Sequence, residues 1–301
     1  MVTLLMIRPT RFGFNEQTAS SNHFQHRKCG VDVHALALEE FDGMVEVLRR
    51  SLIPILVIED TPDSDSPDSI YPNNWFSTHS DGSLVLYPMC SPNRRAERRP
   101  GIIQRIRELA GTSRVVDLSG WEDSGEYLES TGSMVFDRKS RTAYACRSPR
   151  TSEKVLHDFC RQMGYTPFLF DAVDRDGRPI YHTNIMMSVG KEFAVLCKEA
   201  IVSPELCAMM ESGLVSSGKR VVDISFSQMM HFAGNILEVN DLKGERCLLM
   251  SDTAKACLSP AQLESIAGED RIIALHVPHI EEVGGGSVRC MLAEIVSHGR
   301  A

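Results

Sequence analysis

The stretch that decides the fold begins with NILEVN at residues 235–240 and CLLMSD at 247–252. It continues with a helix opened by Ser259 and Pro260 and ends with RIIALHV at 271–277. Short apolar segments rich in β-branched residues are typical of buried strands. Serine suits the N-cap of a helix and proline suits its first position. The stretch therefore predicts a strand–strand–helix–strand (ββαβ) unit.

The same order of elements recurs along the chain. Three further units have strands at 73–79, 83–89 and 114–118, at 132–137, 142–146 and 166–170, and at 184–190, 192–197 and 220–225, with helices near 96–110, 151–163 and 204–214. A fifth unit is split between the chain ends, with strands at 287–296, 1–9 and 54–59 and a helix near 39–51. Five units about 50 residues apart, the last closed by both ends, predict a ring of modules in one domain over residues 1–301. The alternative is an ordinary α/β sandwich with coincidental spacing.

The composition excludes several classes of protein. The 301 residues are 43% hydrophobic and carry a net charge of −8 without a basic stripe, so we expect no nucleic-acid partner. We find no apolar run long enough for a membrane span and no signal peptide, so we expect a soluble, cytoplasmic protein. The nine cysteines form no CxxC pair, which indicates reduced thiols rather than a disulfide framework or a zinc site.

The ring makes a prediction about function. The position at or just before the first strand of each module is occupied by Asn74, Glu129, His182, Asn235 and Cys290. Equivalent positions in a ring converge on its axis, where one pocket can form. A carboxylate, an imidazole and a thiol in one such position are not what packing alone would select.

Each of these residues also has a structural explanation when it is taken alone. A cysteine at the start of a strand is ordinarily a small buried hydrophobe. Cys290, however, follows three glycines, Gly284 to Gly286, which permit close approach of a ligand or a positive φ. Taken alone, His182 would be a structural histidine with satisfied hydrogen bonds, and Glu129 would be a surface acid. Beside a reactive thiol, His182 can act as a general acid/base and Glu129 as its carboxylate partner.

Four motifs in this order resemble the superfamily of arginine deiminase, dimethylarginine dimethylaminohydrolase and glycine amidinotransferase. They are PDSIYPNNW at 67–75, LESTG at 128–132, HTN at 182–184 and GGGSVRC at 284–290. The resemblance covers essentially the whole chain and implies the five-bladed, pseudo-symmetric α/β propeller of that superfamily, the pentein fold. It also implies chemistry that needs no metal and no organic cofactor.

The resemblance implies a role for each matching residue. Cys290 is the nucleophile, His182 the acid/base and Glu129 its carboxylate partner, whereas Asp68, Asn73 and Asn74 fall on substrate-contacting positions. Arg94 and Arg150 match arginines that hold the substrate α-carboxylate, for which a guanidinium fork is well suited. A homodimer is a candidate assembly, because such propellers often dimerise.

Two departures from the superfamily pattern bear on the substrate. Enzymes that act on a guanidinium generally hold it with carboxylates at the positions of Asn74 and Asn184. An amide both donates and accepts hydrogen bonds, whereas a carboxylate only accepts them, so a neutral ureido group fits these positions better. The sequence looks closest to the citrulline-hydrolysing branch, of which 14–22 (FNEQTASSN) and 73–79 (NNWFSTH) are typical.

We therefore expect hydrolysis of the amino acid citrulline to ornithine, carbon dioxide and ammonia through a covalent Cys290 intermediate. Arginine deiminase or dimethylarginine dimethylaminohydrolase activity is the main alternative, because the same three residues serve those reactions. An amidinotransferase or a non-catalytic binding module remains a further alternative. The polar segment 13–32 is a candidate lid over the pocket, which the sequence alone does not decide.

Overall fold

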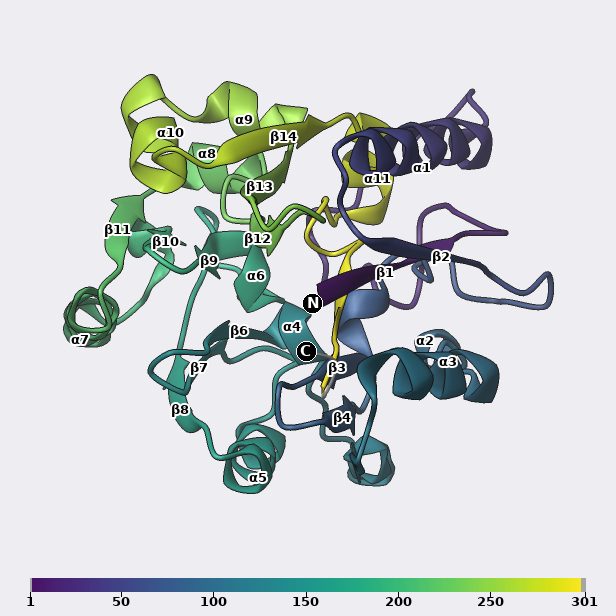
Figure 1. Cartoon of the computed structure of the whole chain (residues 1–301), viewed down its shortest axis with the longest axis horizontal. Helices are drawn as coiled ribbons and strands as arrows, with labels where there is room; N and C mark the ends of the chain where they lie inside the picture. Colours follow the sequence, from purple (N-terminus) through teal and green to yellow (C-terminus); the bar gives the residue numbers. More distant parts are fainter. Residues whose placement is uncertain (1, 299–301) are drawn as a thin grey trace.

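The computed structural model describes residues 2–298, and five small sheets surround a common axis in it (Figure 1). Met1, the first residue of the strand expected at 1–9, and residues 299–301 of the expected domain lie outside the described residues. Every sheet has three strands, the first antiparallel to the second and the second parallel to the third. This is the ring of modules that the repeat predicts and the five-bladed α/β propeller that the family resemblance implies.

The strands follow the predicted modules. In spatial order within each sheet they are β3 (Phe76–Thr78), β4 (Ser83–Leu86) and β5 (Arg114–Asp117); β6 (Met134–Asp137), β7 (Thr142–Cys146) and β8 (Thr166–Phe170); β9 (Met187–Val189), β10 (Phe193–Leu196) and β11 (Arg220–Asp223); β12 (Leu237–Asn240), β13 (Arg246–Ser251) and β14 (Arg271–Leu275); and β15 (Ala293–Val296), β1 (Val2–Arg8) and β2 (Ile55–Glu59).

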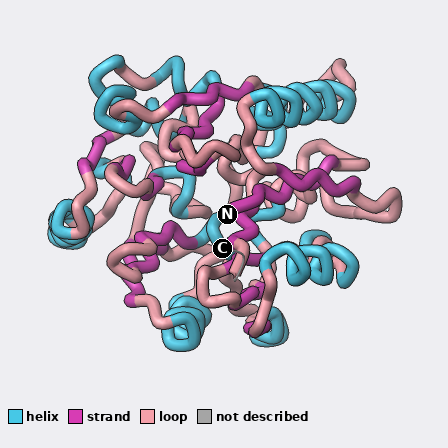
Figure 2. The backbone as a smooth tube through the Cα atoms, in the orientation of Figure 1, coloured by secondary structure: helices cyan, strands magenta, loops and turns pink. Residues whose placement is uncertain are grey.

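A helix connects the second and third strand of each module and lies at the rim of the molecule, outside the strands (Figure 2). These five helices are α1 (Val33–Arg50), α3 (Pro100–Ala110), α5 (Glu153–Met163), α7 (Pro204–Ser216) and α10 (Pro260–Ala267). Shorter helices are η1 (Pro72–Asn74), α2 (Pro92–Arg95), η2 (Ser119–Ser124), α4 (Ser130–Ser133), α6 (Thr183–Met186), η3 (Lys198–Ala200), α8 (Phe226–Met230), α9 (Asp252–Cys257) and α11 (Pro278–Gly284).

The two ends of the chain meet in the fifth sheet. Val2 of β1 is opposite Val296 of β15 in an antiparallel ladder, and Leu4 of β1 pairs with Ile55 of β2 in a parallel one. The second strands β4 and β10 are buried along their whole length, which explains their uninterrupted apolar sequences. No helix within residues 2–298 is long and apolar enough to cross a membrane. All nine cysteines are free thiols.

Several boundaries differ from the prediction. The helix expected from residue 96 begins at Pro100, because the preceding residues form the separate turn α2. The helix expected from residue 39 begins at Val33, where the Asp32 side chain caps the backbone N–H of Ala35. Ser259 does cap α10 and Pro260 begins it.

The glycine-rich segment before Cys290 also differs from the expected loop. Its first glycine, Gly284, is the last residue of α11, and Gly285 ends that helix with a φ of 64°. This left-handed C-cap is a conformation that glycine adopts without steric cost. The strand expected over 287–296 starts only at Ala293, so Cys290 lies in a turn ahead of β15.

Candidate active site

Most of the predicted site residues lie in short segments that precede the first strands, whereas Arg94 and Arg150 follow the second strands β4 and β7. Glu129 and His182 are the N-cap residues of α4 and α6, and Asn74 is the last residue of η1. Six of the nine predicted residues line one pocket at the axis. They are Asp68, Asn74, Arg94, Arg150, His182 and Cys290. Asn73, Glu129 and Asn184 lie directly behind this lining, where they contact Thr131, His182 and Cys290 respectively.

Cys290 is buried and receives two amide contacts. Its Sγ lies 3.5 Å from Nδ2 of Asn184 and 3.4 Å from Nδ2 of Asn235. Asn235 is held in place, because its Oδ1 accepts from the backbone N–H of Arg289 and its Nδ2 also donates to the carbonyl of Asn184. Two amide donors at Sγ can contact negative charge on the sulfur when it develops during a reaction. The repeat placed Asn235 among the axial residues, but no local motif assigned it a role.

His182 and Glu129 form a buried pair with 2.8 Å between Nε2 and Oε2. Burial lowers the pKa of His182, and the hydrogen bond to Glu129 only partly offsets this effect. Burial raises the pKa of Glu129, but the charge of Arg150 and the bond to His182 outweigh it, so the net shift is downward. A neutral imidazole that donates from Nε2 to an ionised carboxylate keeps a lone pair on Nδ1. His182 is therefore in its basic form before substrate binds.

The backbone beside Glu129 is held in a conformation that non-glycine residues rarely adopt. Ser130 has a φ of 41°, and its Oγ donates to the carbonyl of Phe76. Such positions cost on the order of 1–3 kcal/mol and are frequent at functional sites. The next glycine, Gly132, has no space for a side chain, because a Cβ would lie 2.5 Å from Nδ2 of Asn74 and 2.7 Å from the ring of His182. Gly132 thus lets Asn74 approach His182.

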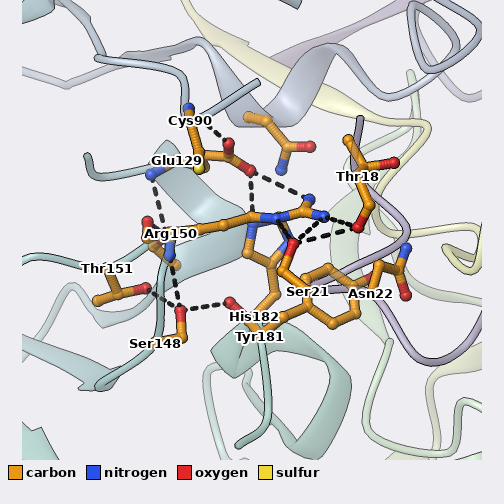
Figure 3. Close-up of polar contacts among 12 residues, drawn as sticks. Thr18, Ser21, Asn22, Cys90, Glu129, Ser148, Arg150, Thr151, Tyr181 and His182 are labelled. Atoms are coloured by element: carbon orange, nitrogen blue, oxygen red, sulfur yellow. Dashed lines mark hydrogen bonds and ion pairs between the residues drawn. The ribbon is translucent and has the colours of Figure 1, made fainter. Parts of the chain in front are cut away.

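Arg150 connects the site to the segment 13–32 (Figure 3). Its Nη1 lies 3.5 Å from Oε2 of Glu129, and its guanidinium carbon lies 4.7 Å from the ring centre of Tyr181. Nε and Nη2 both donate to Oγ of Ser21, at 3.0 and 2.8 Å, and Nη2 also donates to the carbonyl of Thr18. The guanidinium of Arg150, which the sequence analysis assigns to the α-carboxylate of the substrate, is thus contacted by two neutral oxygens.

Arg94 has a different environment. Its Nε and Nη2 pair with the two carboxylate oxygens of Glu97 at 2.9 and 3.0 Å, and both side chains are buried. Its Nη1 donates to Oδ1 of Asn74 at 2.7 Å. Because a guanidinium only donates, this contact fixes the orientation of the amide and directs its Nδ2 elsewhere. Sequence reasoning missed Glu97, although a glutamate three residues after Arg94 in a helical turn was a signal for such a pair.

The pocket is narrow in this structure. Nδ2 of Asn15 and Oγ1 of Thr18 both contact Asp68, and Nδ2 of Asn22 donates to the carbonyl of Gly284. The volume of the pocket is about 10 Å³, which is too small for an amino acid. The segment 13–32 therefore covers part of the pocket, and the pocket has to widen when a substrate enters.

The three glycines before Cys290 allow the covering segment and a tyrosine side chain to pack closely against the backbone. A Cβ on Gly284 would lie 2.0 Å from the hydroxyl oxygen of Tyr71, and one on Gly285 would lie 2.7 Å from Nδ2 of Asn22. Close packing in the pocket wall therefore requires glycine at these positions. Within residues 2–298, no group of three or more His, Cys, Asp or Glu side chains could hold a metal ion.

The fold, together with Cys290, His182 and Glu129 at its axis, defines a member of the guanidino-group-modifying superfamily. The family model described as eukaryotic N,N dimethylarginine dimethylhydrolase matches residues 8–297, and the chain belongs to that family. The description of that family names a hydrolase of dimethylarginine. No protein of curated function matches the chain.

Solved structures share the fold at low sequence identity. The arginine dihydrolase ArgZ of the cyanobacterial ornithine–ammonia cycle has a TM-score of 0.75 and 14% identity, covering 99% of this chain and 41% of ArgZ. Its N-terminal domain, in a cysteine-to-serine variant bound to substrate, has a TM-score of 0.73 and 14% identity, covering 99% of each chain. A dimethylarginine dimethylaminohydrolase has a TM-score of 0.62 and 15% identity, covering 97% of this chain and 98% of that one. The chain thus spans about two fifths of full-length ArgZ.

Proposed function

We propose that this protein hydrolyses citrulline to ornithine, carbon dioxide and ammonia, with Cys290 as nucleophile. One observation carries the choice of substrate: an unpartnered amide donor in the pocket and an unpartnered amide acceptor on a side chain that contacts Cys290. Nδ2 of Asn74 and Oδ1 of Asn184 are buried and have no hydrogen-bond partner within residues 2–298. A ureido group offers a carbonyl oxygen to the first and an NH₂ group to the second, whereas a guanidinium has no acceptor for Asn74.

The remaining polar residues fit the two ends of an amino-acid substrate. Arg150 takes the α-carboxylate, which replaces the neutral contacts from Ser21 and Thr18 when the covering segment moves. Oδ1 of Asp68 is buried and has no hydrogen-bond partner in the described part of the chain, so it can accept a substrate N–H. Arg94, already paired with Glu97, acts as a positioning residue for Asn74. This assignment narrows the sequence-based expectation that both arginines contact the carboxylate.

The first chemical step forms a carbamoyl-thioester. The thiol proton of Cys290 passes to the free Nδ1 of His182, and the sulfur attacks the ureido carbon. Asn184 and Asn235 stabilise the thiolate, and Nδ2 of Asn74 donates to the oxygen as negative charge develops on it. The bond from this carbon to the ornithine nitrogen breaks as the protonated His182 donates its proton to that nitrogen.

The second step releases the enzyme. His182 takes a proton from water, and the resulting hydroxide attacks the carbamoyl carbon. The carbon–sulfur bond breaks, and the proton on His182 returns to sulfur. The carbamic acid so formed decomposes to carbon dioxide and ammonia. Glu129 keeps the imidazole oriented and stabilises its protonated form in both steps.

The test is a product assay on citrulline, arginine, N-methylated arginines and agmatine, with ornithine and ammonia measured for each. We expect turnover of citrulline, and its complete loss in Cys290→Ala. Arginine and methylated arginines are the rival substrates, because the family and the structural relatives bear those names. Turnover of arginine or methylated arginine without any of citrulline would refute the assignment.

A further inference from the structure

A second cavity lies between the first strands of the sheets, on the propeller axis. Its volume is about 440 Å³, and β6, β9, β12 and β15 contribute to its lining. Figure 1 shows β6, β9 and β12 around the centre of the molecule. Asn184 lines this cavity and also contacts Cys290, so the cavity adjoins the active site from behind without sharing its covering segment.

The cavity is basic, although the chain as a whole is acidic. Five basic residues line it: Arg138, Lys139, Lys191, Lys219 and Arg289. Three acidic residues line it: Asp137, Glu238 and Glu294. The difference, five minus three, is a formal excess of two positive charges, whereas the chain carries −8. Such a local reversal of sign favours the entry of anions.

Arg138 is only weakly paired. Its only ion pair within residues 2–298 is a 3.5 Å contact from Nη2 to Glu294, a carboxylate that Arg289 also contacts at 3.1 Å. The Arg138 side chain is 41% exposed, so its other N–H groups can reach a ligand in the cavity. Lys219, by contrast, is paired with Asp137 at 3.5 Å and donates to the carbonyl of Lys191.

We propose that the axial cavity binds a small oxyanion, a metabolite bearing a phosphate or carboxylate group. The free edge of the Arg138 guanidinium is the main contact, since its planar fork matches the oxygens of either group. Lys191 adds a second positive charge. This site is separate from the carboxylate contact of Arg150 and does not depend on the identity of the substrate.

The experiment measures binding to the whole chain by calorimetry and by the midpoint of thermal unfolding. The probes are inorganic phosphate and citrate, each compared with sodium chloride at equal ionic strength to remove general screening. Arg138→Gln is the test variant, and its partial exposure and weak pairing make it compatible with folding. Arg175→Gln, an exposed arginine away from the cavity, is the matched control.

We expect one or both probes to bind and to raise the unfolding midpoint of the wild type and of Arg175→Gln. In Arg138→Gln the dissociation constant should rise about tenfold or more, which is the expected effect of losing a charge-assisted contact. Preference for phosphate or for citrate identifies the group that the site takes. Absence of binding beyond the chloride control, or equal binding in Arg138→Gln, would overturn the proposal. Neither result bears on the turnover of citrulline.

Discussion

Asn74→Asp tests the chemistry that we assign to the pocket, because it changes one amide nitrogen to a carboxylate oxygen. Oδ1 would keep its 2.7 Å contact with Nη1 of Arg94, and Arg94 would balance part of the new charge. The buried donor of Asn74, which has no partner among residues 2–298, would be replaced by an acceptor. The variant therefore preserves the shape and the main protein contact of the side chain.

The expected effect follows from the hydrogen bond that citrulline would lose. A buried carbonyl oxygen without its donor costs about 1–3 kcal/mol, which corresponds to a decrease of about 5- to 150-fold in kcat/KM. Arginine, which presents only N–H groups at this position, would gain an acceptor. The ratio of citrulline to arginine kcat/KM should therefore fall by at least this factor.

The assay is ornithine release from citrulline and product release from arginine, measured over a range of concentrations in the wild type and in Asn74→Asp. Asn240→Asp, an exposed position at the end of β12, makes the same chemical change outside the pocket and should leave both values unchanged. If Asn74→Asp changed citrulline and arginine turnover by the same factor, the donor of Asn74 would not select the substrate, and our reasoning would be wrong.

Three further predictions concern Cys290, His182 and His79. Asn235→Ala removes a hydrogen-bond donor to Sγ, so alkylation of Cys290 by a haloacetamidine, measured by mass spectrometry, should slow about tenfold at neutral pH. An unchanged rate would exclude a role for Asn235. Since burial lowers the pKa of His182, the acidic limb of kcat/KM should lie below pH 6.5, and a limb at or above that pH would contradict a neutral resting imidazole. Burial also lowers the pKa of His79 to about 3. As the pH falls below 6.5, His79 becomes protonated in the unfolded chain but stays neutral in the folded one, so the free energy of unfolding decreases. The loss attributable to His79 is about 2 kcal/mol between pH 6.5 and 5, at about 1.36 kcal/mol per unit, and His79→Phe should flatten the urea-unfolding profile by that amount.

The sequence predicted those parts of the structure that depend on local pattern. The strands β4 and β10 are continuous apolar runs, and Ser259 with Pro260 marks a helix start, so the modules could be recognised without tertiary information. The repeat then placed Glu129, His182 and Cys290 at one axis. The helix α11 was missed because its C-terminal glycines are equally typical of a loop.

Contacts between distant segments could not be predicted in this way. Arg150 reaches Ser21 across 129 positions of the chain, and the segment that carries Ser21 has no periodic pattern to place it. The burial that lowers the pKa of His182 is likewise a property of the assembled axis, to which several modules contribute. Local pattern identifies the candidate groups, but their protonation states and orientations depend on packing.

The orientation of Asn74 illustrates how such packing can determine the substrate. The amide would be free to turn over if only a hydroxyl or water contacted it. Arg94 accepts no hydrogen bond, so its contact with Oδ1 excludes the flipped amide. Glu97 in turn holds Arg94 by both carboxylate oxygens and compensates its buried charge. The choice between a ureido and a guanidino group would therefore depend on Glu97 as well as on Asn74, although Glu97 is not among the residues that line the pocket.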